Sequence, residues 1–153
     1  DAECITDAVG RHGKGIQRAL LEEGPFDLAI IMIGTNDLGK TVAPPEVIVA
    51  HAQALHRCCH QMGVPTVALS VPPNLGTTCN AGYSLQWQTV NRHLEAWANG
   101  VGRASGVAMF VDTAHLLAHA DCGPWESDGL HLTPAGSQWF GRALAPLLRP
   151  LLL

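Results

Sequence analysis

The residues best suited to catalysis form a short motif near the end of the sequence, Asp128-Gly129-Leu130-His131. A carboxylate at this distance before a histidine can fold back to one ring nitrogen and leave the other free to accept a proton from a hydroxyl. The spacing therefore predicts the base of a catalytic triad together with the residue that orients it. Because an aspartate and a histidine ahead of a helix can also cap that helix, the motif alone leaves a capping role open.

A second motif, Gly34-Thr35-Asn36-Asp37, directly follows an apolar run that ends at Ile33. Glycine lets the backbone turn sharply at the end of a strand, and an asparagine there can point its amide into the crevice where open α/β sheets bind ligands. Such an amide is a good donor to an oxyanion. The alternative is a turn in which the polar side chains of this motif bond only to the local backbone.

Strands and helices must bring these motifs together, and the sequence indicates an alternation of the two. Three short apolar runs without polar alternation, at residues 28–33, 66–71 and 107–111, are typical of strands buried on both faces of a parallel sheet. Residues 3–9 form a weaker strand candidate. Both motifs then lie at strand ends or in loops, where an α/β protein places its ligand contacts.

Helices are predicted between these strands from apolar residues spaced by three and four positions. Pro45 suits the first turn of a helix that Gly63 and Pro65 end, and Thr133 with Pro134 opens the last helix. A further helix is expected over residues 85–102. Ile48, His51, Ala52, Leu55 and Cys59 share one face of the first helix, Trp87, Val90, Leu94 and Trp97 are expected to form the buried stripe of the second, and the last helix runs through Phe140, Leu144 and Leu147.

This alternation predicts an α/β protein with helices on both faces of a parallel sheet. The sequence has no internal repeat, low-complexity tract or long linker, so we expect one domain over residues 1–153. Residues 72–74 and 76–82 are expected to form a loop after a strand, where substrate can meet the protein.

Composition excludes several classes of partner. The net charge is -4 and only 14% of residues are charged, so no basic surface is available to attract nucleic acid or an anionic membrane. The apolar runs are far shorter than the ~20 residues that cross a bilayer, and we expect no membrane span. Five irregularly spaced cysteines indicate free thiols in a reducing compartment, so we expect a cytoplasmic protein.

A metal site is an alternative interpretation of the histidine-rich segments, because histidines one helical turn apart suit zinc. The glutamate of the His-Glu-x-x-His metalloprotease motif is absent, however, and we expect no metal and no other cofactor. Adjacent cysteines on a helix point about 100° apart, so we expect them to fill the core rather than to act as a redox pair. The two groups considered are His56, Cys58, Cys59 and His60, and His115, His119 and Cys122.

Together, Gly-Thr-Asn-Asp after a strand and Asp-x-x-His-Leu-Thr-x-x-Gly near the end resemble the SGNH hydrolases, also called GDSL esterases and lipases. The resemblance implies a flavodoxin-like three-layer sandwich and hydrolysis of a small ester or acetylated substrate without metal or cofactor. It also implies roles for individual residues. His131 would be the general base, Asp128 its partner and Asn36 an oxyanion donor, with the N–H of Gly10 as second donor and Gly13 as the alternative glycine.

The nucleophile block of that family, Gly-Asp-Ser at the end of the first strand, has no counterpart in this sequence. Ser70 and Ser127 lie nearest to suitable positions, but neither follows a Gly-Asp pair. We therefore expect an N-terminally incomplete domain whose first, central strand is missing, and a chain that is inactive by itself. Strand edges left without partners favour self-association. The alternative is a non-catalytic, ligand-binding relative or an inactive fragment.

Overall fold

The computed structural model describes residues 15–41, 43–100, 105–117 and 123–153. Its centre is a parallel sheet of β1 (Ala29–Ile31), β2 (Thr66–Leu69) and β3 (Val107–Val111) in the order β1-β2-β3. Ile30 pairs with Val67, and Ala68 with Phe110. Three predicted strands are thus confirmed, β1 and β2 being shorter than expected. The fourth candidate, at residues 3–9, lies outside the described residues.

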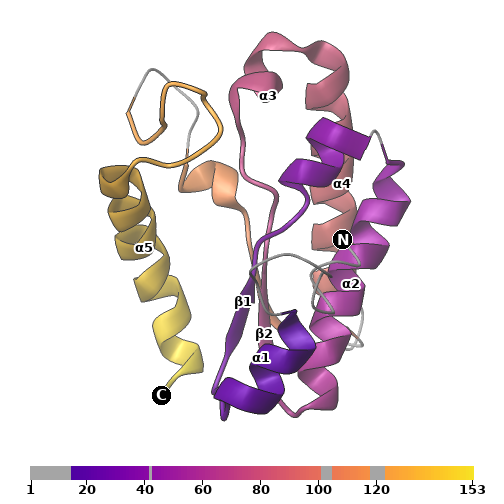
Figure 1. Ribbon diagram of the computed structural model, residues 1–153, viewed down its shortest axis with the longest axis vertical. Helices are drawn as coiled ribbons and strands as arrows, with labels where there is room; N and C mark the ends of the chain where they lie inside the picture. The colour runs from indigo at the N-terminus through magenta and orange to yellow at the C-terminus, as the bar shows by residue number, and fades with distance from the viewer. Residues whose placement is uncertain (1–14, 42, 101–104, 118–122) are drawn as a thin grey trace.

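Helices cover both faces of this sheet, which gives three layers (Figure 1). On one side lie α1 (Ile16–Glu23), α2 (Pro45–Gln61) and α4 (Ala81–Ala98), and on the other lies α5 (Pro134–Leu148). The middle strand β2 is buried at every position. Val67 and Leu69 pack against α5, whereas Ala68 packs against the end of α4. The predicted α/β fold with a parallel, flavodoxin-like sheet is therefore confirmed.

The predicted start of two helices is also confirmed. Pro45 is the first residue of α2, and Thr133 caps α5 by accepting the N–H of Gly136 on its hydroxyl at 2.9 Å. Of the five residues predicted to share one face of α2, four are buried (Ile48, Ala52, Leu55 and Cys59) and His51 is half-buried. The buried Val49, His56 and Cys58 were not part of that prediction.

The segment after β2 differs from the prediction. Residues 76–82 were expected to form a loop, but a short helix α3 (Leu75–Cys79) is followed at once by α4, which begins at Ala81 rather than near residue 85. Two asparagines allow the two helices to follow each other so closely, because at each helix start an asparagine side chain accepts a backbone N–H that has no carbonyl partner within the helix. The Asn74 side chain accepts the N–H of Gly76, and that of Asn80 accepts the N–H of Tyr83.

The β1 edge is less well covered than the rest of the sheet. Ile31 is buried against α1 and α2, so its neighbours Ile30 and Met32 face the other layer, where they are 46% and 40% exposed. Within the described residues, β1 pairs only with β2. All three strands run toward the same end of the molecule, where α3 and the loop before α5 also lie (Figure 1).

Candidate functional site

The Asp128-His131 motif forms the hydrogen bond that its spacing predicts. His131 Nδ1 lies 2.7 Å from Asp128 Oδ2. A carboxylate only accepts, so Nδ1 carries the hydrogen and the Nε2 of the neutral ring is left with a free lone pair. The helix cap is Thr133, not Asp128 or His131, so the capping alternative does not describe this loop. The arrangement can remove a proton from a hydroxyl that approaches Nε2.

The Asp128 carboxylate is held as an anion. Its second oxygen accepts the backbone N–H groups of Leu130 and His131, at 2.8 and 3.0 Å. The hydrogen bond from the His131 side chain, helped by these backbone bonds, lowers the pKa of Asp128 from 3.8 to about 2. The carboxylate therefore stays ionised across the neutral range and fixes the orientation of the imidazole.

The loop around this pair is closed by its own backbone. Glu126 N–H donates to His131 O at 2.7 Å, and Thr133 N–H donates to Pro124 O at 2.9 Å. At Gly136, in the first turn of α5, any side chain would collide with the carbonyl of Pro124. Glycine at this position lets α5 approach the loop closely and so sets the place of His131 above the sheet.

The Gly34-Asp37 motif follows β1, where the chain turns into a wide helical segment, Asp37–Thr41. Gly34 has a φ of 114°, and a Cβ at this position would lie 2.8 Å from a methyl carbon of Val71. Asp37 is buried, with Oδ1 3.6 Å from Nδ1 of His51 on α2. Asn36, by contrast, is exposed, and its amide makes no hydrogen bond among the described residues. The turn hydrogen bonds proposed as an alternative role for Asn36 are therefore absent from this part of the chain.

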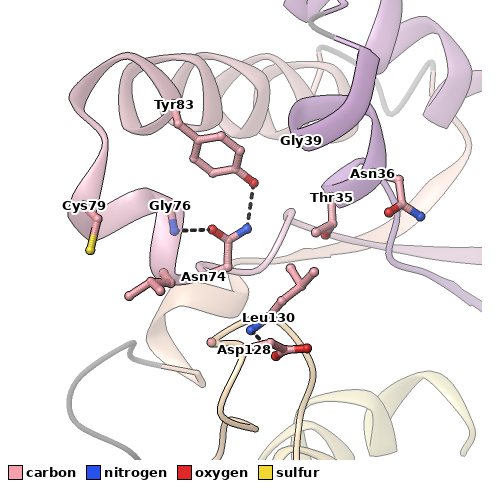
Figure 2. Close-up of a pocket in the computed structure, with 11 residues that line it drawn as sticks. Thr35, Asn36, Gly39, Asn74, Gly76, Cys79, Tyr83, Asp128 and Leu130 are labelled. Atoms are coloured by element: carbon pink, nitrogen blue, oxygen red, sulfur yellow. Dashed lines mark hydrogen bonds between the residues drawn. The ribbon is translucent and has the colours of Figure 1, made fainter.

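A cavity of about 500 Å³ brings the two motifs together (Figure 2). Asn36 and Asp128 both line it, as does the segment from Asn74 to Tyr83. Leu75 N–H donates to Gly129 O at 2.9 Å and thereby joins α3 to the loop that carries His131. The volume of the cavity lies in the range of small-ligand sites. Among the described residues, the lining consists of Thr35, Asn36, Gly39, Asn74, Leu75, Gly76, Cys79, Tyr83, Asp128, Gly129 and Leu130.

Sequence reasoning placed Asn74 in a substrate-facing loop but did not single out Tyr83. Tyr83 is the third residue of a helix that was expected to start later, so no predicted element placed its ring near the motifs. Its hydroxyl accepts a hydrogen bond from Asn74 Nδ2 at 2.6 Å. The one usable signal was that Tyr83 is the single tyrosine of the chain.

Two other predicted candidates have different surroundings. Ser70, considered as a substitute nucleophile, is fully buried, and its hydroxyl bonds to Asp112 Oδ1 at 3.0 Å and to Thr113 Oγ1 at 2.8 Å. Ser127 is exposed. Gly10 and Gly13, the candidate oxyanion glycines, lie outside the described residues.

Two of the histidines considered as metal ligands, His56 and His60, lie within hydrogen-bond distance of the same hydroxyl. His56 Nδ1 and His60 Nε2 lie 2.7 and 2.8 Å from Thr66 Oγ1. Burial, followed by repulsion from His60, lowers the pKa of His56 to about 4, so this buried ring is neutral near pH 7. Within the described part of the chain, no group of three or more histidine, cysteine, aspartate or glutamate residues could hold a metal ion. His119 and Cys122 lie outside that part.

Comparison with known proteins supports one family. The model of the GDSL-like lipase/acylhydrolase family matches residues 5–139, which include both motifs and all three strands. None of the curated proteins compared with the chain matches it. In the described residues, no helix has the length and apolar character needed to cross a membrane. On the match over residues 5–139, the chain belongs to the GDSL-like lipase/acylhydrolase family.

Proposed function

We propose that this chain carries the base and oxyanion parts of a serine esterase site that hydrolyses a small ester or acetylated substrate. One observation carries the proposal. The 2.7 Å bond between His131 Nδ1 and Asp128 leaves Nε2 free to accept a proton, and Asp128 lines a cavity together with Asn36. Family membership supports acyl hydrolysis as the general reaction.

The serine nucleophile would come from a Gly-Asp-Ser block on a strand that precedes residue 1 and pairs with β1. The β1 edge supports this: it has no second strand beside it among the described residues, and Ile30 and Met32 are large, partly exposed apolar residues that a neighbouring strand and helix would bury. In a flavodoxin-like order of 2-1-3-4-5, the strands β1, β2 and β3 occupy the last three places. The first strand of such a sheet would then lie against β1.

The reaction would proceed in two steps. His131 Nε2 removes the serine proton as the hydroxyl oxygen attacks the ester carbonyl, and the protonated ring then donates that proton to the leaving alcohol. The Asn36 amide and the N–H of Gly10 would donate to the negative oxygen of the tetrahedral intermediate. Water, activated by the same histidine, hydrolyses the acyl-enzyme. The ionised Asp128 stabilises the imidazolium in both steps. No metal or other cofactor takes part.

The decisive experiment uses the protein from the complete gene and a short-chain p-nitrophenyl ester. His131→Ala should lower kcat/KM by about 10³-fold or more, because the base of a triad is lost. The matched control is His115→Ala, since His115 also lies three residues after an aspartate and 3.5 Å from its carboxylate, at Asp112. We expect the control to retain full turnover and both variants to keep the wild-type unfolding free energy.

Two results would contradict the proposal in different ways. Turnover that survives His131→Ala would exclude His131 as the base. A complete protein that binds esters and hydrolyses none of them would favour the non-catalytic relative instead. Labelling by a fluorophosphonate, which reacts with an activated serine, separates the two: a labelled serine outside residues 1–153 supports the missing-strand proposal.

A further inference from the structure

The cavity contains one hydroxyl whose hydrogen-bond direction is fixed by its neighbours, that of Tyr83. Asn74 Oδ1 accepts the backbone N–H of Gly76 at 2.8 Å, which turns the Nδ2 of the same amide toward the tyrosine oxygen, 2.6 Å away (Figure 2). An amide nitrogen only donates. The tyrosine oxygen is therefore the acceptor in this bond, and its own hydrogen must point elsewhere.

No described residue accepts that hydrogen. The only hydrogen bond of the Tyr83 hydroxyl within the described chain is the one it accepts from Asn74. Asn74 is buried, and Tyr83 is half-buried with its hydroxyl in the cavity lining (Figure 2). A tyrosine hydroxyl that is shielded from bulk solvent normally finds a hydrogen-bond partner. A molecule in the cavity is thus in a position to supply the acceptor.

The lining limits what that acceptor can be. Asp128 contributes a carboxylate, and none of the described lining residues is a lysine or an arginine, so this part of the cavity favours a neutral group over an anionic one. Leu75 and Leu130 contribute apolar surface. We propose that Tyr83 donates its hydrogen to an uncharged oxygen of the substrate, an ether, hydroxyl or carbonyl oxygen, and so selects esters that carry an oxygen beyond the scissile bond. This inference rests on the proposed esterase function for the identity of the ligand.

The connection to the catalytic loop makes Tyr83 a specificity residue rather than a remote contact. The bond from Leu75 N–H to Gly129 O holds α3 against the loop between Asp128 and His131. Asn74, at the start of the same short helix, then holds the tyrosine. A substrate oxygen bound by Tyr83 would therefore be positioned in a fixed relation to the ester that His131 acts on.

The test compares esters that differ only by oxygen in place of a methylene group. For the acyl side the pair is p-nitrophenyl methoxyacetate and p-nitrophenyl butyrate, and for the alcohol side it is methoxyethyl acetate and butyl acetate. The measured quantity is the ratio of kcat/KM for the oxygen-containing member to that for its partner, in the complete protein. For at least one pair, Tyr83→Phe should lower this ratio by about three- to tenfold, the size of one neutral hydrogen bond.

A second variant separates a donor role from a structural one. Asn74→Asp keeps a good helix cap, but the new carboxylate can only accept, so Tyr83 must turn its hydrogen inward. The contact between the two side chains survives while the free hydrogen is lost. We therefore expect Asn74→Asp to lower the ratio as Tyr83→Phe does. Thr78→Val, which removes an exposed hydroxyl from the same helix outside the cavity, should leave the ratio unchanged.

The outcomes distinguish this inference from the proposed function. Ratios that stay at the wild-type value in Tyr83→Phe for both pairs overturn the inference while hydrolysis stands. A ratio lowered in Tyr83→Phe but unchanged in Asn74→Asp also overturns it, because the ring and not its hydrogen would then matter. If the complete protein hydrolyses no ester, the corresponding amides are used as ligands in saturation-transfer NMR. Binding that favours the oxygen-containing amide in the wild type, and loses that preference in Tyr83→Phe, then supports the inference, and equal binding in the wild type overturns it.

Discussion

The two loops that carry the motifs lie at the same end of the sheet but are held by different interactions. After β1, the chain is built into the core: Gly34 packs against Val71, and Asp37 and Leu38 are only 6% and 4% exposed. Before α5, the side chains of Asp128 and His131 are 50% and 74% exposed, and hydrogen bonds within the loop fix them.

This difference separates what each loop contributes to stability from what it contributes to the proposed chemistry. Removing contacts from a packed core destabilises the whole domain, whereas exposed side chains away from such packing change stability little. Substitutions at the buried positions after β1 should therefore lower stability and activity together. Substitutions at Asp128 and His131 should act mainly on activity, because these exposed side chains add little to stability.

The largest effect is expected for Asp128→Asn in the complete protein. The amide keeps the loop bonds through its oxygen but presents NH₂ to the histidine, so Nδ1 must become the acceptor and Nε2 carries the hydrogen. A base in that tautomer cannot accept the serine proton, and kcat/KM should fall by about 10³- to 10⁴-fold. Urea unfolding should give the wild-type free energy within about 0.5 kcal/mol. A comparable loss of stability would show that this loop, too, is part of the folding core.

The next largest effect is expected for Gly34→Ala, and here it is on stability. The new methyl group meets Val71 at 2.8 Å, and alanine is strained at a φ of 114°. We expect the unfolding free energy to fall by about 2 to 5 kcal/mol, combining backbone strain with overpacking. Gly141→Ala is the matched control, because a Cβ there meets nothing within 4 Å on α5 and the change should be neutral or slightly stabilising. Equal stabilities of the two variants would contradict the packing argument.

The features that sequence predicted are those set by local chemistry. An apolar run predicts strand β3 at Val107–Val111, Pro45 predicts the start of α2, and Thr133 predicts the cap of α5. Each of these signals occupies only a few neighbouring positions. The Asp128-His131 bond is equally local, because three residues separate its partners. Their catalytic roles, and those of Asn36 and Gly10, remain predictions.

The features that sequence missed depend on contacts between distant segments or on polar residues inside helices. The short helix α3, capped by Asn74, lies in a stretch rich in glycine, threonine and asparagine, a composition that predicts a loop. The pair of Asp37 with His51 joins two elements, and neither residue reveals the other in the sequence. The cavity itself arises only when the sheet brings Asn36, Tyr83 and Asp128 to one end.

The smallest effect is a pH dependence confined to the exposed loop. Because the folded pKa of Asp128 is lowered to about 2 from 3.8, its ionised form contributes stability that is complete above pH 3.8 and is lost as the pH falls through about 2. The amide hydrogens of Leu130 and His131, which the carboxylate accepts, report on this state in NMR spectra. Their chemical shifts should stay constant from about pH 5 to about pH 3 and change only below. The Leu38 amide, bonded to Gly34 O at 2.9 Å in the buried loop, is the internal control. If the amide chemical shifts of Leu130 and His131 instead changed with a midpoint near pH 3.8, the carboxylate would not hold this loop. The contrast between the two loops would then rest on burial alone.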